Sequence, residues 1–295
     1  MPREQLLGFF AAIAVVFIWS SWLIISRLGV HTSLTIYDLA AIRFGLSGLI
    51  VLPFVIYFKT WRTISLAKAL IVAFSIGPIY ALLAFGGFSF SPAFHGGVFM
   101  NGFLPLITVF LSFLIGQKIT ISQLLGSILI LFGSMTILFD TQNFFSNSSL
   151  FGDILFVLSA ICLSFFMVLV KRWDLQYGQI LFSICLVNAI IYLPVWFFFL
   201  PIGTQSFGDL LEDRNVVINI LFQGFVPNLM GLFLTAYSAK MIGPSKASAL
   251  LAAVPITGAL LGSFFLSESP TFFGWLSLLI VSIGILLVVI KGREV

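Results

Sequence analysis

Long apolar runs alternate with short polar turns along the whole chain, which predicts a bundle of membrane-spanning helices. Each run has about the 20 residues that a helix needs to cross a hydrocarbon core of roughly 30 Å, and the turns between runs are polar or carry Gly and Pro. The ten predicted spans are Leu6–Ser26, Tyr37–Phe58, Ser65–Phe88, Pro92–Ile115, Ser122–Phe139, Gly152–Val170, Gln179–Leu200, Val217–Ser238, Lys246–Leu266 and Phe272–Ile290. The first run is too long for a signal peptide and lacks a small-residue cleavage site, so it is interpreted as helix one.

The basic residues predict the orientation of these spans, because Lys and Arg concentrate in cytoplasmic loops. With the N-terminus inside, the inner segments hold eleven basic residues, the outer segments hold Arg27 and Arg214, and Arg43 falls within the second span. Acidic residues such as Asp153 and Asp209 lean outward. An even number of spans with both termini in the cytoplasm follows.

Composition excludes most other classes of protein. Charged residues make up 8% of the 295 residues and hydrophobic residues 60%, whereas an average soluble domain is roughly 25% charged. A soluble enzyme, a nucleic-acid binder and a disordered protein are therefore set aside. Cys162 and Cys185 lie inside apolar runs and are interpreted as small core residues, so neither a disulfide nor a metal framework is expected. The chain carries no catalytic or ATP-binding motif, and we expect no enzymatic activity, metal or cofactor.

Internal repetition divides the chain into two five-helix units, residues 1–140 and 152–295, joined by an external linker at 141–151. Matching residues recur at near-constant offsets: Gly8 and Gly152 are 144 apart, and Thr120 and Thr271 are 151 apart. An odd number of helices in each unit makes the second unit enter the membrane from the opposite side. The prediction is an inverted repeat, an arrangement common in secondary transporters.

Several short motifs resemble one known family. They are Ile18-Trp19-Ser20-Ser21, Ala40-Ala41-Ile42-Arg43-Phe44, Ser91-Pro92-Ala93-Phe94-His95-Gly96-Gly97, Asn101-Gly102-Phe103-Leu104-Pro105-Leu106, Gly243-Pro244-Ser245-Lys246-Ala247, Pro255 and Leu266-Ser267-Glu268. Over essentially its whole length the chain resembles the EamA-type branch of the drug/metabolite transporter superfamily. That family usually has a Gly-Glu-like turn after the fourth and ninth helices, where this chain has Gly116-Gln117 and Ser267-Glu268.

The resemblance implies an all-α integral membrane protein with ten helices in two inverted repeats and a central cavity. Helices one, three, four, six, eight and nine would line the cavity, and helices five and ten would form the outer framework. It further implies export of amino acids or related metabolites, with one subgroup resembling exporters of aromatic amino acids.

Polar and aromatic side chains at membrane depth are the candidates for a substrate site, because such groups are costly there and usually face a cavity or a partner helix. Each has an alternative structural interpretation, namely packing in a Phe-rich bundle for the aromatic residues, interhelical hydrogen bonds for the amides and close helix contact for the serines. The candidate substrate-binding residues are Trp19, Ser20, Tyr80, Asn101, Ser164 and Asn228.

Gating or hinge candidates lie at helix ends and at prolines within spans, where a freed backbone carbonyl often marks a broken helix. Two of them have simpler interpretations: His95 as a hydrogen-bonded residue at a helix end, and Lys246 as a positive-inside anchor. The gating or hinge candidates are Pro78, His95, Pro105, Pro227, Lys246 and Pro255. Gly258 and Gly262 form a small-residue pair that fits either sliding or static helix contact.

Arg43 is the deepest clear charge in the sequence. It is a candidate for holding a substrate carboxylate or a gating partner. Alternatively, its side chain reaches outward to the interface or pairs with Asp38.

The favoured function is a secondary transporter that exports small amphipathic metabolites, with amino acids as the main class and aromatic ones included. Because no carboxylate lies deep in a span, facilitated diffusion or exchange is favoured over strict proton antiport. The alternatives are uptake or exchange of a nucleotide-like or cofactor-like solute, an integral-membrane enzyme, or a scaffold that does not transport. The expected partners are a small-molecule substrate and the lipid bilayer, without nucleic acid. We expect the chain to function as a monomer, with an oligomer as the alternative. We expect multi-pass insertion in the cell membrane, with a bacterial inner membrane favoured.

Overall fold

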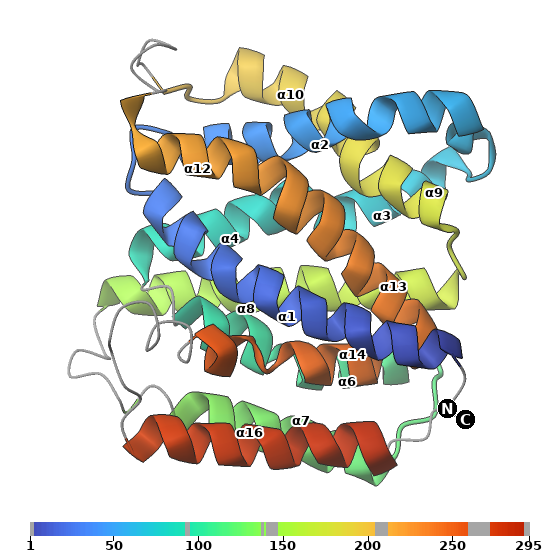
Figure 1. Cartoon of the computed structure of the whole chain (residues 1–295), viewed down its shortest axis with the longest axis vertical. Helices are drawn as coiled ribbons and strands as arrows, with labels where there is room; N and C mark the ends of the chain where they lie inside the picture. The colour runs from blue at the N-terminus through green and yellow to red at the C-terminus, as the bar shows by residue number, and fades with distance from the viewer. Residues whose placement is uncertain are drawn as a thin grey trace.

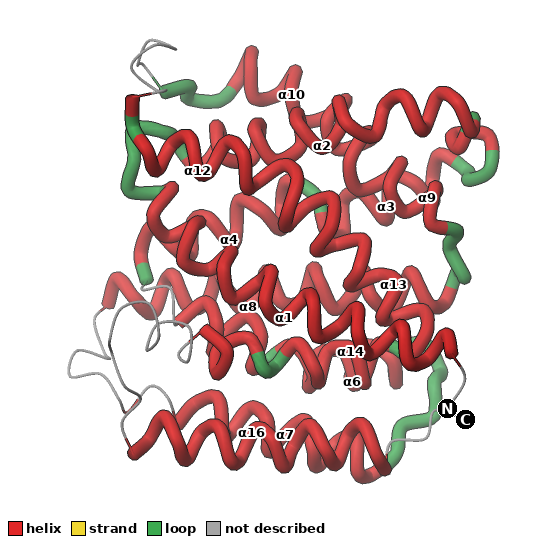
Figure 2. The backbone as a smooth tube through the Cα atoms, in the orientation of Figure 1, coloured by secondary structure: helices red, strands yellow, loops and turns green. Residues whose placement is uncertain are grey.

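The computed structural model describes residues 3–91, 95–136, 139, 147–203, 212–258 and 272–291. Within these ranges the chain is helical apart from short turns, and no strand occurs (Figure 2). The longer helices are α1 (Arg3–Gly29), α2 (Ile36–Phe58), α3 (Leu66–Ile76), α4 (Pro78–Phe90), α6 (Leu104–Leu114), α7 (Ile121–Thr136), α8 (Asn147–Arg172), α10 (Asn188–Phe199), α12 (Arg214–Gln223), α13 (Leu232–Ile242) and α16 (Phe272–Lys291). Shorter pieces are the 3₁₀ turn η1 (Thr60–Arg62), the helices α9 (Tyr177–Leu181) and α14 (Pro244–Leu251), and the π-helical segments η2 (Gly96–Gly102), η4 (Phe182–Val187) and η5 (Gly224–Gly231).

Seven helical stretches among the described residues are long and apolar enough to cross a membrane, so the chain is a multi-pass membrane protein. They are Arg3–Gly29, Ile36–Phe58, Leu66–Phe90, Gly96–Leu114, Leu150–Arg172, Tyr177–Phe199 and Arg214–Ile242. All seven coincide with predicted spans. The predicted fifth and tenth spans coincide with shorter apolar helices, Ile121–Thr136 and Trp275–Ile290. The end of the predicted ninth span, with Gly262 and the Ser267-Glu268 turn, lies outside the described residues. The count of ten and the cytoplasmic position of the termini stay predictions.

The helices form stacked layers that run roughly parallel to one another (Figure 1). α2 packs on α10 at one edge, and α7 packs on α16 at the opposite edge (Figure 1). Between these edges, α1 packs along α13 and α4 along α8, while α6 lies against both α8 and α14. The first turn of α1 and the last turn of α16 lie at the same end of the bundle (Figure 1).

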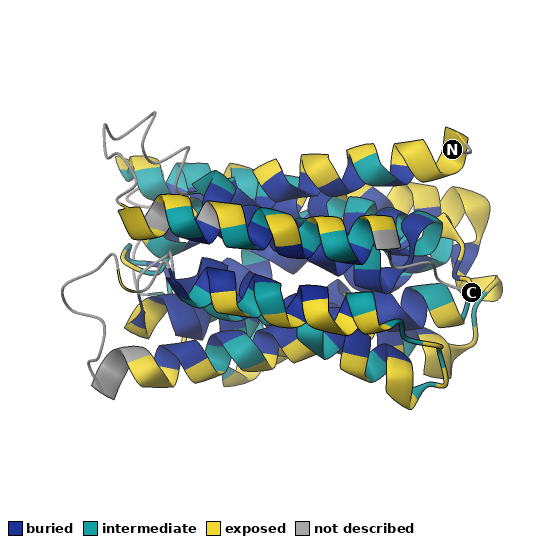
Figure 3. Ribbon diagram, turned by 90° about the horizontal axis from the view of Figure 1, so that it is seen from below, coloured by how far each residue is buried: buried dark blue, intermediate teal, exposed yellow. Residues whose placement is uncertain are grey.

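Burial follows the layers. Buried residues face the interior of the bundle and exposed residues its outside (Figure 3). Many outward residues are large and apolar, with Phe198 72% and Phe54 60% exposed. Such a surface would aggregate in water but matches the hydrocarbon of a bilayer.

Glycines set the close contact between α7 and α16. A Cβ on Gly126 would lie 2.8 Å from the carbonyl oxygen of Gly284, and a Cβ on Gly284 would lie 2.9 Å from that of Gly126. Both obstacles are backbone atoms, which a rotamer change cannot move away. Small residues at these positions let the two backbones approach, as is typical of helix pairs in membranes.

The four predicted proline hinges all lie at interruptions of helical geometry. Pro78 starts α4 directly after Gly77 ends α3, and Pro105 follows the π-helical η2. Pro227 lies inside the π-helical η5, and Pro255 follows a short turn after α14. A proline removes one backbone donor and displaces the carbonyl one turn earlier, which favours such interruptions. Motion at these positions stays a prediction.

Candidate functional site

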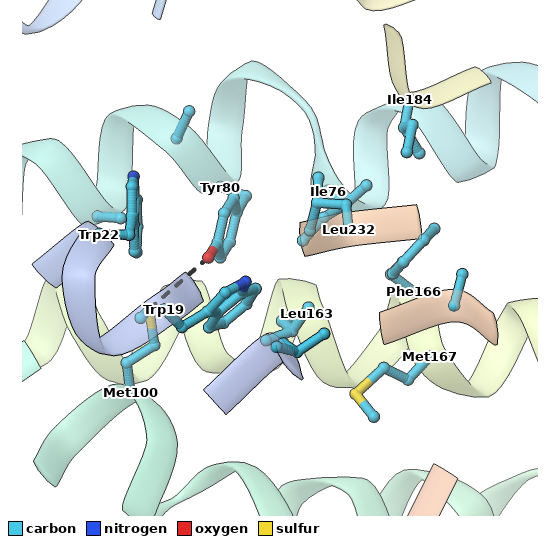
Figure 4. Close-up of a cluster of buried hydrophobic side chains, with 14 of the residues drawn as sticks. Trp19, Trp22, Ile76, Tyr80, Met100, Leu163, Phe166, Met167, Ile184 and Leu232 are labelled. Atoms are coloured by element: carbon cyan, nitrogen blue, oxygen red, sulfur yellow. Dashed lines mark hydrogen bonds between the residues drawn. The ribbon is translucent and has the colours of Figure 1, made fainter. Parts of the chain in front are cut away.

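Three aromatic rings meet in the middle of the bundle, and we call them, together with Arg43, the central cluster. Trp19 and Trp22 lie three residues apart on α1, so they share a face, and Tyr80 reaches them from α4 (Figure 4). The ring centroids are 5.9 Å apart for Trp19 and Trp22, 6.5 Å for Trp19 and Tyr80, and 6.3 Å for Trp22 and Tyr80. Trp22 and Tyr80 are stacked at an interplanar angle of 16°. All three side chains are buried.

Arg43 completes this cluster from α2. Its guanidinium carbon lies 5.3 Å from the ring centroid of Trp22 and 5.8 Å from that of Tyr80, within cation–π range. The Arg43 Nε–H donates to Oδ1 of Asn228 at 3.2 Å. The residue is only 1% exposed, so the interpretation in which Arg43 reaches outward to the interface is wrong.

The alternative pairing of Arg43 with Asp38 is also wrong. Asp38 lies in the first turn of α2 and forms a capping box with Thr35. Its carboxylate also accepts hydrogen bonds from Trp196 Nε1 at 2.9 Å and from the backbone N–H of Gly203 at 3.0 Å. Among the described residues no carboxylate lies within 4.0 Å of the Arg43 guanidinium. Arg43 is therefore a buried cation without an anionic partner in that part of the chain, a costly arrangement that usually has a functional reason.

Asn228 joins helices as well as contacting Arg43. Its Nδ2 donates to Ser47 Oγ on α2 at 2.7 Å and lies 4.0 Å from Cys185 Sγ on η4. The interhelical interpretation therefore accounts for Asn228. The same amide fixes the orientation of the guanidinium, which makes it a positioning residue for the cluster.

Several buried polar atoms in this region have no protein hydrogen-bond partner among the described residues. They include Trp19 Nε1, Arg43 Nη1 and both Oδ1 and Nδ2 of Asn101. Buried polar groups are nearly always paired, so unpaired ones need an explanation such as a missing ligand. Asn101 lies on η2 beside Met100, whose sulfur is 3.9 Å from the Tyr80 hydroxyl (Figure 4).

Ser20 and Ser164 serve helix packing in this structure. Ser20 Oγ donates to Val16 O at 2.8 Å and lies 3.1 Å from Val254 O, beyond the end of α14. Ser164 Oγ is 3.1 Å from Thr108 Oγ1 on α6. Among the described residues neither serine forms a hydrogen bond to a side chain of the central cluster, and their role in substrate binding stays a prediction.

A ladder of polar side chains on α12 was not predicted from the sequence. Trp22 Nε1 donates to Gln223 Oε1 at 2.9 Å, and Gln223 Nε2 donates to Asn219 Oδ1 at 3.1 Å. Asn219 in turn donates to the backbone carbonyl of Ile25 at 3.2 Å. The signal was present in the spacing, because Asn215, Asn219 and Gln223 recur every four residues and so share one face of a helix. The ladder holds the Trp22 ring in place.

His95 pairs with Asp153 across the bundle. The distance from His95 Nδ1 to Asp153 Oδ1 is 2.7 Å, and Ser91 Oγ donates to the same carboxylate oxygen at 3.1 Å. Both residues are buried, so Asp153, counted above among the outward acidic residues, is not solvent-exposed. The pair connects the segment before η2 to α8.

Lys246 lies at the other end of the bundle, where it lines a cavity of about 570 Å³. Lys171 lines the same cavity, and on α8 it is about 18 residues from Asp153, or about 27 Å at 1.5 Å per residue. The two predicted gates, His95 and Lys246, therefore lie at opposite ends of the bundle with the central cluster between them.

Comparison with known proteins identifies the family. The chain matches the EamA-like transporter family over residues 6–139 and 150–290. It belongs to this family. The EamA-like chain is 27% identical over 165 residues to the uncharacterized transporter YdfC of Bacillus subtilis (strain 168), an alignment that covers 54% of this chain. The aligned region spans about half of that relative's length.

A solved structure shares the fold. The crystal structure of another protein superposes on this chain with a TM-score of 0.76. The superposition covers 98% of this chain and 97% of the other chain. At 16% identity this likeness supports the architecture alone. Together these findings make the chain a multi-pass membrane protein of a transporter family.

Proposed function

We propose that this EamA-like protein is a secondary transporter that exports small amphipathic metabolites, chiefly amino acids and among them aromatic ones. The substrate binds at the central cluster and is exposed to each side of the membrane in turn. The carboxylate lies against Arg43, and the apolar part stacks on Trp19, Trp22 or Tyr80.

The buried Arg43 is the observation that carries this proposal. Its guanidinium has an unpartnered Nη1–H and no carboxylate within 4.0 Å among the described residues. A substrate carboxylate would satisfy both the charge and the free donor, and charge-assisted hydrogen bonds of this kind are strong. The aromatic faces beside it suit an apolar or aromatic side chain.

The packing supports alternating access by two inverted repeats. In the proposed ten-span numbering, α1 on α13 is the contact of span one with span eight, and α4 on α8 is that of span three with span six. With five helices in each repeat, span one corresponds to span six and span three to span eight. Exchanging the two repeats therefore turns the first contact into the second. Rocking of such related halves around a site between them is the usual way in which inverted-repeat carriers work.

Energy coupling separates two versions of the proposal. The sequence favoured facilitated diffusion or exchange, because no deep carboxylate was visible. The structure adds a buried carboxylate, Asp153, which pairs with His95. The transport assay therefore needs one arm driven by substrate alone and one with a pH gradient.

Exchange in proteoliposomes tests the proposal. Vesicles with purified protein are loaded with one unlabelled amino acid, and uptake of the same labelled compound is measured with and without a pH gradient. A panel of aromatic, aliphatic and charged amino acids, with a polyamine and an aromatic cation, defines the class. We expect uptake of a zwitterionic amino acid without any pH gradient, and slower uptake of compounds that lack a carboxylate.

Two variants tie the transport to the central cluster. Arg43→Gln removes the charge and should lower uptake about tenfold or more, because hydrogen bonds to charged groups contribute about 1.5–3 kcal/mol. Phe198→Ala, on the lipid-facing surface, should leave uptake unchanged. Equal uptake by Arg43→Gln and the native protein would remove Arg43 from the site, and no uptake of any tested compound would overturn the proposed substrate class.

A further inference from the structure

A cavity of about 570 Å³ opens at the end of the bundle where α1 begins and α8 ends. Its wall is assembled from four places in the chain: the first turns of α1, the turn after α6, the end of α8 and the junction of α13 with α14. The side chains that carry its chemistry are Gln5, Gln117, Lys118, Lys171 and Lys246. Its volume lies within the usual range for small-molecule sites.

Three ammonium groups in this wall lack acidic partners. No carboxylate of the described residues lies within 4.0 Å of Lys118, Lys171 or Lys246. The nearby Asp174 is paired with Lys240 at 2.8 Å instead. Three like charges around one hollow repel one another, and an anion between them would relieve that repulsion.

Capping of helix ends does not explain two of these lysines. Lysines near helix C-termini often donate to the last free carbonyls. Lys171 Nζ does this, because it donates to the carbonyl oxygen of Lys240 at 2.8 Å. The neighbouring carbonyls of Leu175 and Ile115 accept from Lys240 at 3.1 Å and from Arg172 at 3.2 Å. Within the described part of the chain, Lys118 and Lys246 make no such bond, so they remain for another role.

The position of Lys246 adds to the positive potential. It is the third residue of α14, a helix that begins at Pro244 directly after Gly243. Helix N-termini carry partial positive charge and free N–H groups, so a cation there is unfavourable for the helix but favourable for binding an anion. Gly243 has φ of 88°, a conformation that glycine adopts most easily, and it lines the cavity.

We propose that this cavity, which we call the lysine cavity, binds a phosphate group at a site separate from the central cluster. Lysines act as point charges that suit a phosphate with more than one negative charge, and the amides of Gln5 and Gln117 can donate to its remaining oxygens. The phosphate belongs either to a soluble phosphorylated compound or to the headgroup of an anionic phospholipid. Occupancy would neutralise the lysines at the mouth of the bundle.

Calorimetric titration of the full-length chain in a neutral detergent tests this site without any transport. The probes are inorganic phosphate and dioctanoyl phosphatidylglycerol, with dioctanoyl phosphatidylcholine as a control for the acyl chains. In the variant Lys118→Gln/Lys246→Gln we expect binding to weaken at least about tenfold, because two of the three charges are lost. Lys68→Gln, which removes an exposed lysine outside the cavity, should bind as the native protein does.

The outcomes separate the two sources of phosphate. If inorganic phosphate binds and the double lysine variant weakens this binding, the site takes a soluble phosphorylated compound. If only phosphatidylglycerol binds in this way, the site takes a lipid headgroup. Binding of neither probe, or equal weakening by Lys68→Gln, overturns the proposal. Lys246→Arg keeps the charge and should retain binding, which separates loss of the site from loss of the fold. Since the central cluster is untouched, failure here leaves the proposed transport function standing.

Discussion

Two buried asparagines in the same membrane protein should respond in opposite ways to the same substitution. Both side-chain atoms of Asn101 lack a hydrogen-bond partner among the described residues, whereas Asn228 bonds Arg43 and Ser47. Leucine has a similar branched shape but no polar atom. Asn101→Leu should therefore stabilise the protein, and Asn228→Leu should destabilise it.

The magnitudes follow from what each amide does. A buried polar group without a partner costs about 1–3 kcal/mol, which Asn101→Leu would recover. Asn228→Leu removes a bond to the Arg43 guanidinium, a type that contributes about 1.5–3 kcal/mol, together with the bond to Ser47. Interhelical hydrogen bonds in membranes average about 0.6 kcal/mol, so the loss of both bonds lies between about 1 and about 4 kcal/mol.

Thermal unfolding in detergent measures the order of the midpoints, which should be Asn101→Leu, then native, then Asn228→Leu. The exchange assay on the same samples separates stability from function. If Asn101 faces the substrate in an open state, Asn101→Leu should be more stable than the native protein and yet slower in uptake. A lower midpoint for Asn101→Leu than for the native protein would refute the reasoning, because it would mean that the amide is paired.

The remaining predictions concern packing, the buried pair and pH. Gly126→Ala should destabilise the protein by about 1–3 kcal/mol in thermal unfolding, because its Cβ would press on backbone atoms of α16. In a double-mutant cycle of His95→Gln and Asp153→Asn, the two changes should couple by about 1.5–3 kcal/mol, and additive losses would contradict a direct bond. The hydrogen bond from Lys240 lowers the pKa of Asp174. The folded state therefore favours the charged carboxylate, and the stability lost in Asp174→Asn at pH 7 should shrink as the pH falls below about 3.9.

A matched control for the glycine prediction lies on α2. A Cβ on Gly45 would meet its nearest atom, Leu193 Cδ2, at 3.5 Å, an ordinary contact. Gly45→Ala should therefore be neutral or stabilising by up to about 1 kcal/mol through helix propensity. Equal destabilisation by Gly45→Ala and Gly126→Ala would show that backbone contact does not explain the α7–α16 packing.

Most of the helical architecture could be predicted, because crossing a hydrocarbon core requires long apolar runs and few charges. The meeting of Trp19 with Tyr80 was less accessible, since hydropathy does not specify which faces of two helices touch. Arg43 illustrates the limit best. Its position along the second span was compatible with a side chain that reaches the membrane interface and with one that pairs with Asp38. The observed partner is Asn228, which lies 185 residues away in the sequence.

Charged pairs were predicted less well than spans, for a related physical reason. Asp153 was assigned to the outer end of a span, and no partner was predicted for it. Its burial depends on His95 and Ser91, which approach from the other predicted repeat. A sequence shows where a charge lies along its own helix, but not which neighbouring helix shields it.

The two ends of α8 differ in a way that bears on the direction of transport. At the Asp153 end, the pair with His95 is buried and connects the two predicted repeats. At the Lys171 end, the described residues leave a cavity of about 570 Å³ lined by three lysines. If the Lys171 end is cytoplasmic, as the distribution of basic residues predicts, the lysine cavity opens on the cytoplasmic side. If the protein exports amino acids as proposed, this positive cavity lies on the side from which the substrate carboxylate would enter.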